Sequence, residues 1–208
     1  MQIKGDRKLI IGADRLDPTK GVPNRIDGIE RLLQKYPDSA NKFISLQITP
    51  RSRAGIPAYE ENRDLVRRRI MEVNDQGNES WKPIHYTEQN VPREILMGEY
   101  RAADICMITT LRDGMHLGIK EAIAAQDPDD PAVFILSQFA GAAEELEGHG
   151  VILINPYDPD TIAEALHEAM TMPHWQRKAR YDSLIQVLQK NDVAHWARQC
   201  LRPLDNHI

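Results

Sequence analysis

Short apolar runs alternate with longer amphipathic stretches along the chain, which is the pattern of repeated strand–helix units. Each run is short enough for one buried strand, and the runs lie at residues 8–12, 42–48, 84–86, 105–109, 133–136 and 151–154. Strands that are separated by helices usually pair in parallel. The pattern therefore predicts an α/β fold in which a mostly parallel sheet carries helices on both faces.

The amphipathic stretches carry signals for where helices begin and end. Pro23 suits the first turn of a helix, and apolar residues recur at helical spacing from Ile26 onward. This helix is expected to end near Tyr36, because Pro37 disfavours helical geometry in the residue before it. Residues 75–80 are predicted to form a surface loop. Further helices are expected at residues 58–75, 92–103, 161–172 and 174–190, and no strand separates the last two.

Composition excludes several classes of protein. The 208 residues include 26 Lys and Arg against 31 Asp and Glu, a net charge of −5, whereas nucleic-acid-binding proteins usually carry a basic excess. No apolar run approaches the roughly 18 residues that a membrane span needs. Residues 1–8 lack the apolar stretch of a secretory signal, so we expect no export. Cys106 and Cys200 are too few for a disulfide framework, and we expect reduced thiols in the cytoplasm. The length predicts one domain.

The loop after the first predicted strand is a candidate phosphate site. Ligands of open parallel sheets bind beyond the carboxyl ends of the strands. Residues 12–21 follow the first strand and place Arg15 and Lys20 in one loop bounded by glycines. Two such cations suit a diphosphate, because Arg supplies a planar fork and Lys a point charge. The alternative is a solvated loop whose glycines serve only the turn.

The segment after the fourth predicted strand, residues 109–121, is a second candidate. Asp113 and Gly114 are expected to form a tight turn before a helix whose free N–H groups attract anions. Glu121 falls about two turns into this helix, where it is able to reach a sugar hydroxyl. The alternatives are a cap for Asp113 and a surface charge for Glu121. Residues 138–145 start a further helix with small residues, which permit close approach of the backbone to a ligand or of the helix to the sheet, and packing is the default explanation.

Other chemistry has no support from motifs. The sequence lacks Gly-x-x-x-x-Gly-Lys-Ser/Thr, Gly-x-Gly-x-x-Gly and Gly-x-Ser-x-Gly segments. Its histidines show no metal-ligand spacing with cysteine, so we expect neither a metal held by side chains nor a bound cofactor. An aromatic content of 6% offers no platform for stacking nucleic-acid bases.

Three segments together resemble the donor-binding half of trehalose-6-phosphate synthases: GADRLDPTKG (12–21), LRDGMHLGIKE (111–121) and LSQFAGAAEE (136–145). Residues 155–158, 172–173 and 191–192 continue the match in order. These enzymes are retaining glycosyltransferases (hexosyltransferases) with the two-domain GT-B fold. The resemblance implies that residues 1–208 form a single Rossmann-like donor-binding domain with C-terminal helices, and that the N-terminal acceptor domain is absent.

The resemblance also implies roles for residues of the two loops. Arg15 and Lys20 would bind the diphosphate of a UDP-glucose or GDP-glucose type donor and stabilise the charge that builds on it in the transition state. Asp113 would bind sugar hydroxyls as the third catalytic residue, and Glu121 would bind the ribose. Backbone N–H groups facing the sugar and phosphates would come from Gly114, Met115, His116, Leu117 and Gly118.

The base would be contacted elsewhere, because Val91 matches a position whose main chain reaches the base and Leu96 one that packs nearby. The implied reaction, in trehalose biosynthesis, transfers glucose from UDP-glucose to glucose 6-phosphate without a metal or an obvious protein nucleophile. An acceptor domain or partner subunit would be needed for turnover.

His116 and Gly118 depart from the family pattern Asp-Gly-Met-Asn-Leu-Val. Three alternatives therefore stay open: a glucosylglycerol-phosphate synthase, a validoxylamine-type pseudoglycosyltransferase and a non-catalytic nucleotide-sugar-binding domain.

Overall fold

The computed structural model describes residues 4–53 and 55–205, apart from the side chains of residues 199, 200 and 202–205. Within these residues, six strands form one sheet: β1 (Lys8–Ala13), β2 (Phe43–Ile48), β3 (Ile84–Thr87), β4 (Ile105–Ile108), β5 (Val133–Ser137) and β6 (Ile152–Ile154). All neighbouring strands run parallel, so that Ile11, for example, pairs with both Leu46 and Cys106. The sequence prediction of each strand is correct to within one residue at either end.

The order of the strands in the sheet is β3-β2-β1-β4-β5-β6. The chain therefore proceeds from β1 toward one edge and from β4 toward the other. Connections that leave β1 and β4 diverge to opposite faces, and this opens a crevice at the carboxyl ends of these two strands. The topology thus brings residues 12–21 and 109–121 together, although about a hundred residues separate them.

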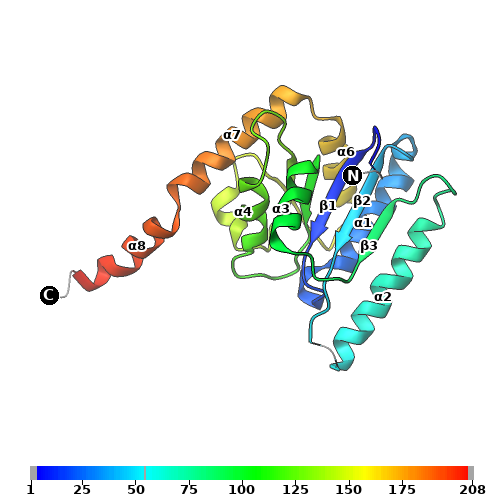
Figure 1. Cartoon of the computed structure of the whole chain (residues 1–208), viewed down its shortest axis with the longest axis horizontal. Coiled ribbons are helices and arrows are strands. Elements are labelled where there is room, and N and C mark those ends of the chain that lie inside the picture. Colours follow the sequence, from blue (N-terminus) through cyan, green and yellow to red (C-terminus); the bar gives the residue numbers. More distant parts are fainter. Residues whose placement is uncertain (1–3, 54, 206–208) are drawn as a thin grey trace.

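Helices cover both faces of the sheet (Figure 1). One face carries α1 (Val22–Lys35), α2 (Pro57–Asn74) and α6 (Pro159–Thr171). The other face carries α3 (Arg93–Ala102), α4 (Leu117–Ala124), α5 (Ala142–Leu146) and α7 (His174–Lys190). Short 3₁₀ turns lie at η1 (Pro18–Lys20) and η2 (Pro37–Ser39).

A third C-terminal helix, α8 (Val193–Asp205), extends away from the sheet beyond α7 (Figure 1). The hydrophobic pattern predicts only two helices in this region. A local contact makes α8 a separate helix. The carboxylate of Asp192 accepts a hydrogen bond of 2.7 Å from the N–H of His195 and so caps the start of α8.

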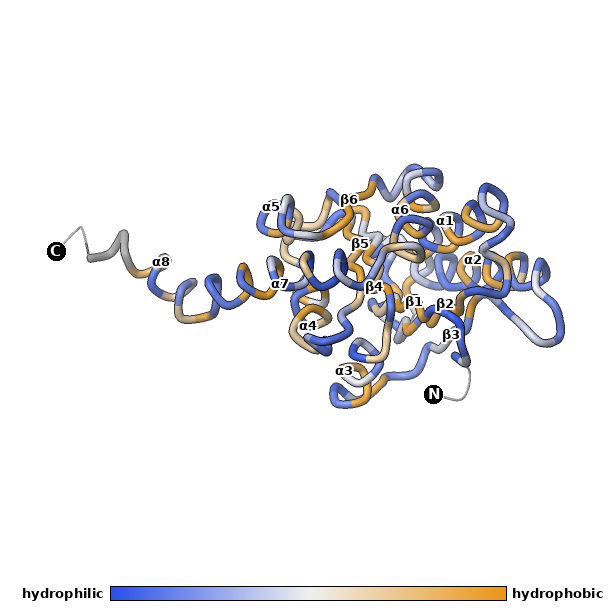
Figure 2. Tube along the Cα trace, turned by 90° about the horizontal axis from the view of Figure 1, so that it is seen from above, coloured by the Kyte–Doolittle hydropathy of each residue, from blue (hydrophilic) through white to orange (hydrophobic). Residues whose placement is uncertain are grey.

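The sheet separates two apolar clusters because successive strand residues point to opposite faces. Ile10 packs toward α1 and α6, whereas Leu9 and Ile11 pack toward α3 and α4. Figure 2 shows the apolar strands between more hydrophilic outer segments. Cys106 lies in this interior, where burial raises the pKa of its thiol, and the side chain of Cys200 lies outside the described part. Among the described helices, none is both long and apolar enough to cross a membrane.

Gly28 lies on the face of α1 that packs against α6. A Cβ atom on this residue would stand 2.2 Å from Cγ2 of Ile162. The close approach explains a glycine in a helix interior, where it would otherwise be unfavourable.

We expect Gly28→Ala to lower the free energy of unfolding by about 1–3 kcal/mol, because overpacking outweighs the gain in helix propensity. The matched control is Gly98→Ala in α3, where a Cβ meets nothing within 4 Å. This control should be at least as stable as the wild type. Urea unfolding followed by circular dichroism measures both variants. A Gly28→Ala variant more stable than the wild type would contradict the close packing of α1 on α6.

Candidate functional site

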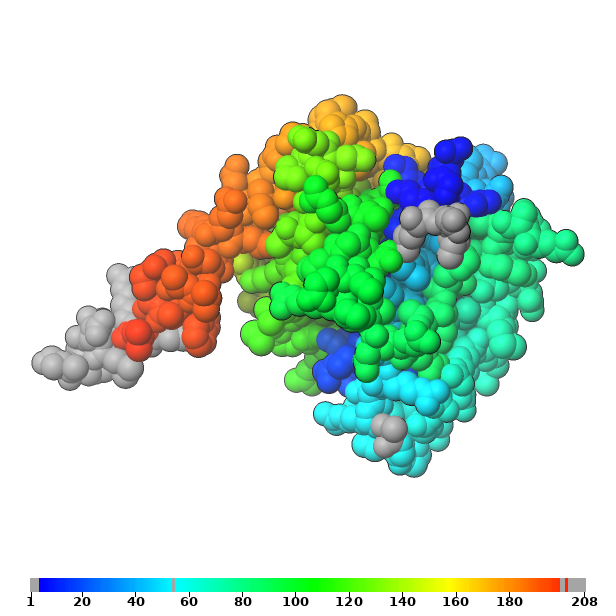
Figure 3. Space-filling model, viewed as in Figure 1, coloured from blue at the N-terminus to red at the C-terminus, as the bar shows by residue number. Residues whose placement is uncertain are grey.

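The loops after β1 and β4 line one cleft at the carboxyl edge of the sheet. The loop after β1 reaches the surface beside the segment that follows β2 (blue and cyan in Figure 3), where Leu16 N–H donates to the carbonyl of Pro50 over 2.9 Å. The cleft has a volume of about 530 Å³, a size that suits a small molecule. Its lining comprises Ala13, Asp14, Arg15, Lys20, Asp113, Gly114, Met115, His116, Leu117, Gly118 and Glu121.

Nine of the predicted site residues therefore lie together, and two lie elsewhere. Val91 belongs to the connection between β3 and α3, and Leu96 lies in α3. Both are half-buried against the apolar cluster on this face of the sheet and do not line the cleft. Contacts of these two residues with a base stay a prediction. Within the described residues, no group of three or more His, Cys, Asp or Glu side chains is placed to hold a metal ion.

The loop after β1 is fastened to the loop after β4. Asp17 caps the η1 turn by accepting hydrogen bonds from the N–H and hydroxyl of Thr19, at 3.0 and 2.9 Å. The carbonyl of Thr19 in turn accepts the N–H of Leu111 over 2.7 Å. Gly21 has a φ of 62°, and a Cβ there would stand 2.1 Å from the carbonyl oxygen of Thr109. A glycine is thus required both by the left-handed backbone and by the close approach.

The loop between β5 and α5 holds the far side of the second loop. Asp113 N–H donates to the carbonyl of Phe139 over 3.3 Å, and Gly141 N–H donates to the carbonyl of Asp113 over 2.8 Å. A Cβ on Gly141 would stand 2.0 Å from the carbonyl oxygen of Gly114. The small residue at this position therefore permits contact between two backbones, which is the packing explanation for this segment.

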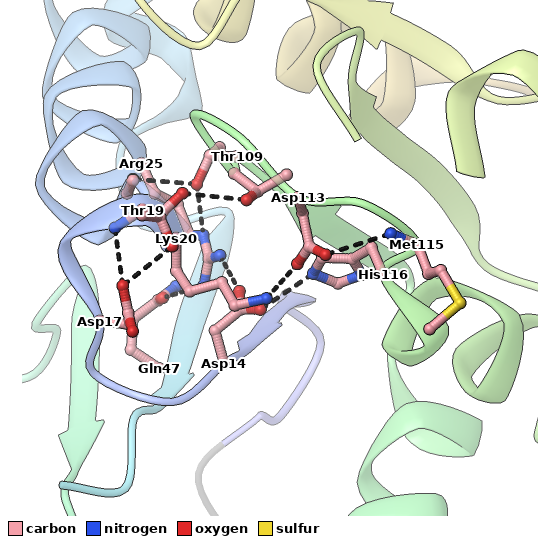
Figure 4. A network of polar contacts seen from close by, with 12 residues as sticks. Asp14, Asp17, Thr19, Lys20, Arg25, Gln47, Thr109, Asp113, Met115 and His116 are labelled. Carbon is pink, nitrogen blue, oxygen red and sulfur yellow. Dashed lines mark hydrogen bonds and ion pairs between the residues drawn. The ribbon is translucent and has the colours of Figure 1, made fainter. Parts of the chain in front are cut away.

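Two of the predicted catalytic side chains contact each other. The ammonium of Lys20 forms an ion pair with the carboxylate of Asp113 (Figure 4), and both side chains are largely buried. Burial acts to raise the pKa of Asp113, but the hydrogen bonds from Lys20 and Met115 and the charge of Lys20 together outweigh it, so the pKa lies below its ordinary value. Asp113 also accepts the N–H of Met115 over 3.3 Å, which makes it the cap of its turn. Arg15 is exposed at the rim of the cleft.

Glu121 lies at the edge of the cleft, in α4. One carboxylate oxygen lies 3.1 Å from the guanidinium of Arg93, and both side chains are more than a third exposed. Water weakens ion pairs of this kind, so a ligand is able to displace Arg93 at little cost.

A buried polar network forms the floor of the cleft (Figure 4). The guanidinium of Arg25 is fully buried and forms an ion pair with Asp14. It also donates to the side-chain oxygens of Gln47 and Thr109, each at 3.1 Å. Asp14 lies 3.0 Å from Nε2 of His116 as well.

These contacts fix the protonation state of Asp14. Burial acts to raise the pKa of this carboxyl, but the charge of Arg25 and the hydrogen bonds from Arg25 and His116 together outweigh it, so the pKa lies below its ordinary value. An ionised carboxylate only accepts hydrogen bonds, so Nε2 of His116 must carry a proton.

The motifs do not point to Asp14, Arg25 or Gln47, yet the sequence contains a signal for Arg25. Arg25 stands three residues after Val22 and four before Ile29, so it lies on the apolar face of its helix. A charged residue in that position must be paired inside the protein. The partner itself is not visible in the sequence, because it depends on how α1 packs against β1.

The chain matches the model of Glycosyltransferase family 20 over residues 1–206. It is 42% identical over 198 residues to a trehalose-6-phosphate synthase of Enterobacter sp. (strain 638), and 42% identical over 199 residues to one of Sinorhizobium fredii. The matches cover 95% of this chain but only 41% and 42% of those relatives. The chain therefore spans less than half the length of the curated relatives it matches.

Solved structures show the same similarity. An alpha,alpha-trehalose-phosphate synthase (UDP-forming) from Burkholderia xenovorans, in complex with glucose-6-phosphate, superposes with a TM-score of 0.94 at 39% identity, covering 98% of this chain and 45% of that one. A structure described as trehalose-6-phosphate from E. coli bound with UDP-2-fluoro glucose gives 0.93 at 40% identity, covering 98% and 45%. The predicted fold class and the resemblance are both confirmed.

The lowered pKa of Asp14 makes stability depend on pH in acid. An aspartate in the unfolded chain titrates near 3.9, and the folded value lies below its ordinary one. The carboxylate therefore contributes stability above that pH, and the contribution is lost as the pH falls through the folded pKa. Asp14→Asn does not titrate at this position, so its loss of stability below about pH 4 should be shallower than that of the wild type. Urea unfolding from pH 7 to pH 3 measures this, and identical profiles would contradict it.

Proposed function

The chain belongs to glycosyltransferase family 20, and from this membership we propose that it is the nucleotide-sugar-binding part of a trehalose-6-phosphate-forming enzyme. The reaction would transfer glucose from UDP-glucose to glucose 6-phosphate with retention of anomeric configuration. The observation that carries the proposal is the convergence of Arg15, Lys20 and the first turn of α4 on one cleft. Both closely similar solved structures support it, because one contains glucose-6-phosphate and the other UDP-2-fluoro glucose.

The chemistry of the cleft fits a diphosphate leaving group. Arg15 supplies a forked donor and Lys20 a compact charge from the same loop. Opposite them, α4 begins without a side-chain cap, so N–H groups of its first turn are free for an anion. Negative charge grows on the diphosphate as the glycosidic bond breaks, so these groups stabilise the transition state more than the bound donor.

The pair between Lys20 and Asp113 suggests how the donor is accepted. A diphosphate competes with Asp113 for the ammonium of Lys20. Once Lys20 contacts the diphosphate, the carboxylate of Asp113 is released to accept hydrogen bonds from sugar hydroxyls, which lie next to the diphosphate in the donor. Glu121 exchanges its exposed partner Arg93 for the ribose hydroxyls in the same way. In this proposal Val91 and Leu96 contact the base of the nucleotide sugar.

The acceptor side of the reaction is assigned to another part of the enzyme. This chain spans 41% of the Enterobacter relative. In a two-domain GT-B enzyme its cleft would hold only the donor side of the bond that reacts. Without the opposing N-terminal acceptor domain, or a partner subunit, glucose 6-phosphate is not held for attack. We place this chemistry in the cytoplasm, where the buried thiol of Cys106 stays reduced.

We expect the chain to bind UDP-glucose in isothermal calorimetry, and Arg15→Ala and Lys20→Ala each to weaken binding at least tenfold, or about 1.4 kcal/mol. Lys35→Ala is the control, because this lysine lies on α1 and pairs with Glu164, away from the cleft. Parallel titrations with UDP, GDP and GDP-glucose identify the base. Failure of the intact chain to bind any nucleotide or nucleotide sugar would overturn the proposal in favour of a non-binding domain.

The chain alone should not complete the reaction. With UDP-glucose and glucose 6-phosphate, a coupled assay of UDP release should show no turnover above the rate without protein, because the acceptor is not positioned. Turnover by the isolated chain would show that the acceptor site does not require a further domain.

A further inference from the structure

His116 is held in an unusual position between the cleft and α4. Its φ of 59° lies in the left-handed region, which few residues other than glycine adopt. The residue is only 5% exposed, and Nε2 of its ring contacts Asp14. Because Asp14 also holds the fully buried Arg25, the ring is anchored to the floor of the cleft.

The ring does not cap the helix that follows it. A polar residue immediately before a helix usually accepts an N–H bond from the first turn. Here the side chain of His116 makes no such bond, and its Nδ1 is buried without a hydrogen-bond partner. The orientation of the ring is therefore determined by Asp14 and not by α4.

Gly118 provides the space that this orientation needs. A Cβ on Gly118 would stand 3.3 Å from Cε1 of His116, closer than Cβ atoms usually pack, and 3.7 Å from Nδ1, an ordinary contact distance. Gly118 has no positive φ, so its backbone conformation does not require glycine. Glycine is also unfavourable within a helix. The His116 ring is thus the contact that explains a glycine in the first turn of α4.

We infer that His116 and Gly118 form one positioning unit, in which the anchored ring lies in the space above Gly118 and fixes the first turn of α4 relative to Asp14. The inference rests on the proposed function, because that turn would present its N–H groups to the donor diphosphate. His116 is a positioning residue, since its ring nitrogens are buried beneath the cleft. It also links two departures from the family pattern: the larger ring at one position requires the missing side chain at the other.

A double-mutant cycle tests the unit, with Gly118→Ala, His116→Asn and the double variant. Asparagine suits the left-handed backbone at residue 116 and leaves room for a Cβ at residue 118. Calorimetry should show that Gly118→Ala raises the Kd for UDP-glucose about tenfold in the wild-type background, but less than twofold in the His116→Asn background. Gly98→Ala, which adds the same methyl to α3 in open space, should leave the Kd unchanged.

Several outcomes would overturn the inference. An equal effect of Gly118→Ala in both backgrounds, or no effect in either, would show that the glycine is not the space for the ring. Thermal unfolding of the same variants separates positioning from stability, because a lower Tm with a wild-type Kd would mean a structural role only.

Amide hydrogen exchange decides the inference without any ligand. The amides of residues 121–124 bond to carbonyls in the first turn of α4, so they report on its order. Their exchange should be faster in Gly118→Ala than in the wild type, and slower in the double variant than in Gly118→Ala. If the wild type binds no UDP-glucose, the proposed function fails, and this exchange pattern alone then confirms or overturns the His116–Gly118 unit.

Discussion

The buried ion pair between Asp14 and Arg25 is the constraint on which the cleft depends. Arg25 comes from α1 and Asp14 from the end of β1, and the other two nitrogens of the guanidinium donate to Gln47 of β2 and to Thr109 after β4. Loss of either charged partner would leave a buried charge uncompensated, at a cost of about 3–5 kcal/mol. Helix α1, strands β1 and β2 and the segment after β4, which together hold the cleft in place, are therefore positioned relative to a single guanidinium group.

Much of the fold could be predicted because a parallel sheet covered on both faces has strands that are apolar throughout. Residues 105–109 and 133–136 illustrate this, since their apolar runs are bounded by polar turns. The position of the cleft also follows from sequence, because the order of strands in such sheets places ligands beyond β1 and β4. For that reason Arg15, Lys20 and Asp113 could be identified from the sequence as candidates that line this cleft.

The sequence does not show which charged side chains form ion pairs with each other. Lys20 and Asp113 are both predictable as site residues, yet their ion pair arises only when two loops about ninety residues apart are packed together. Arg25 is conspicuous on an apolar helix face, but its bond to Asp14 requires the register of α1 on the sheet. The helix α8 was missed because its start depends on a single local cap at Asp192.

The contact between the backbones of Gly141 and Gly114 affects how mutagenesis of this cleft is interpreted. The geometry at this point is specified by an absent side chain, and an alanine scan, which reports what is lost on removing a side chain, adds a methyl group here instead. Loss of binding in such a scan would place Gly141 among the ligand contacts, although it lies behind the loop that lines the cleft. Sensitivity to substitution and contact with a bound ligand are thus separate properties at this position.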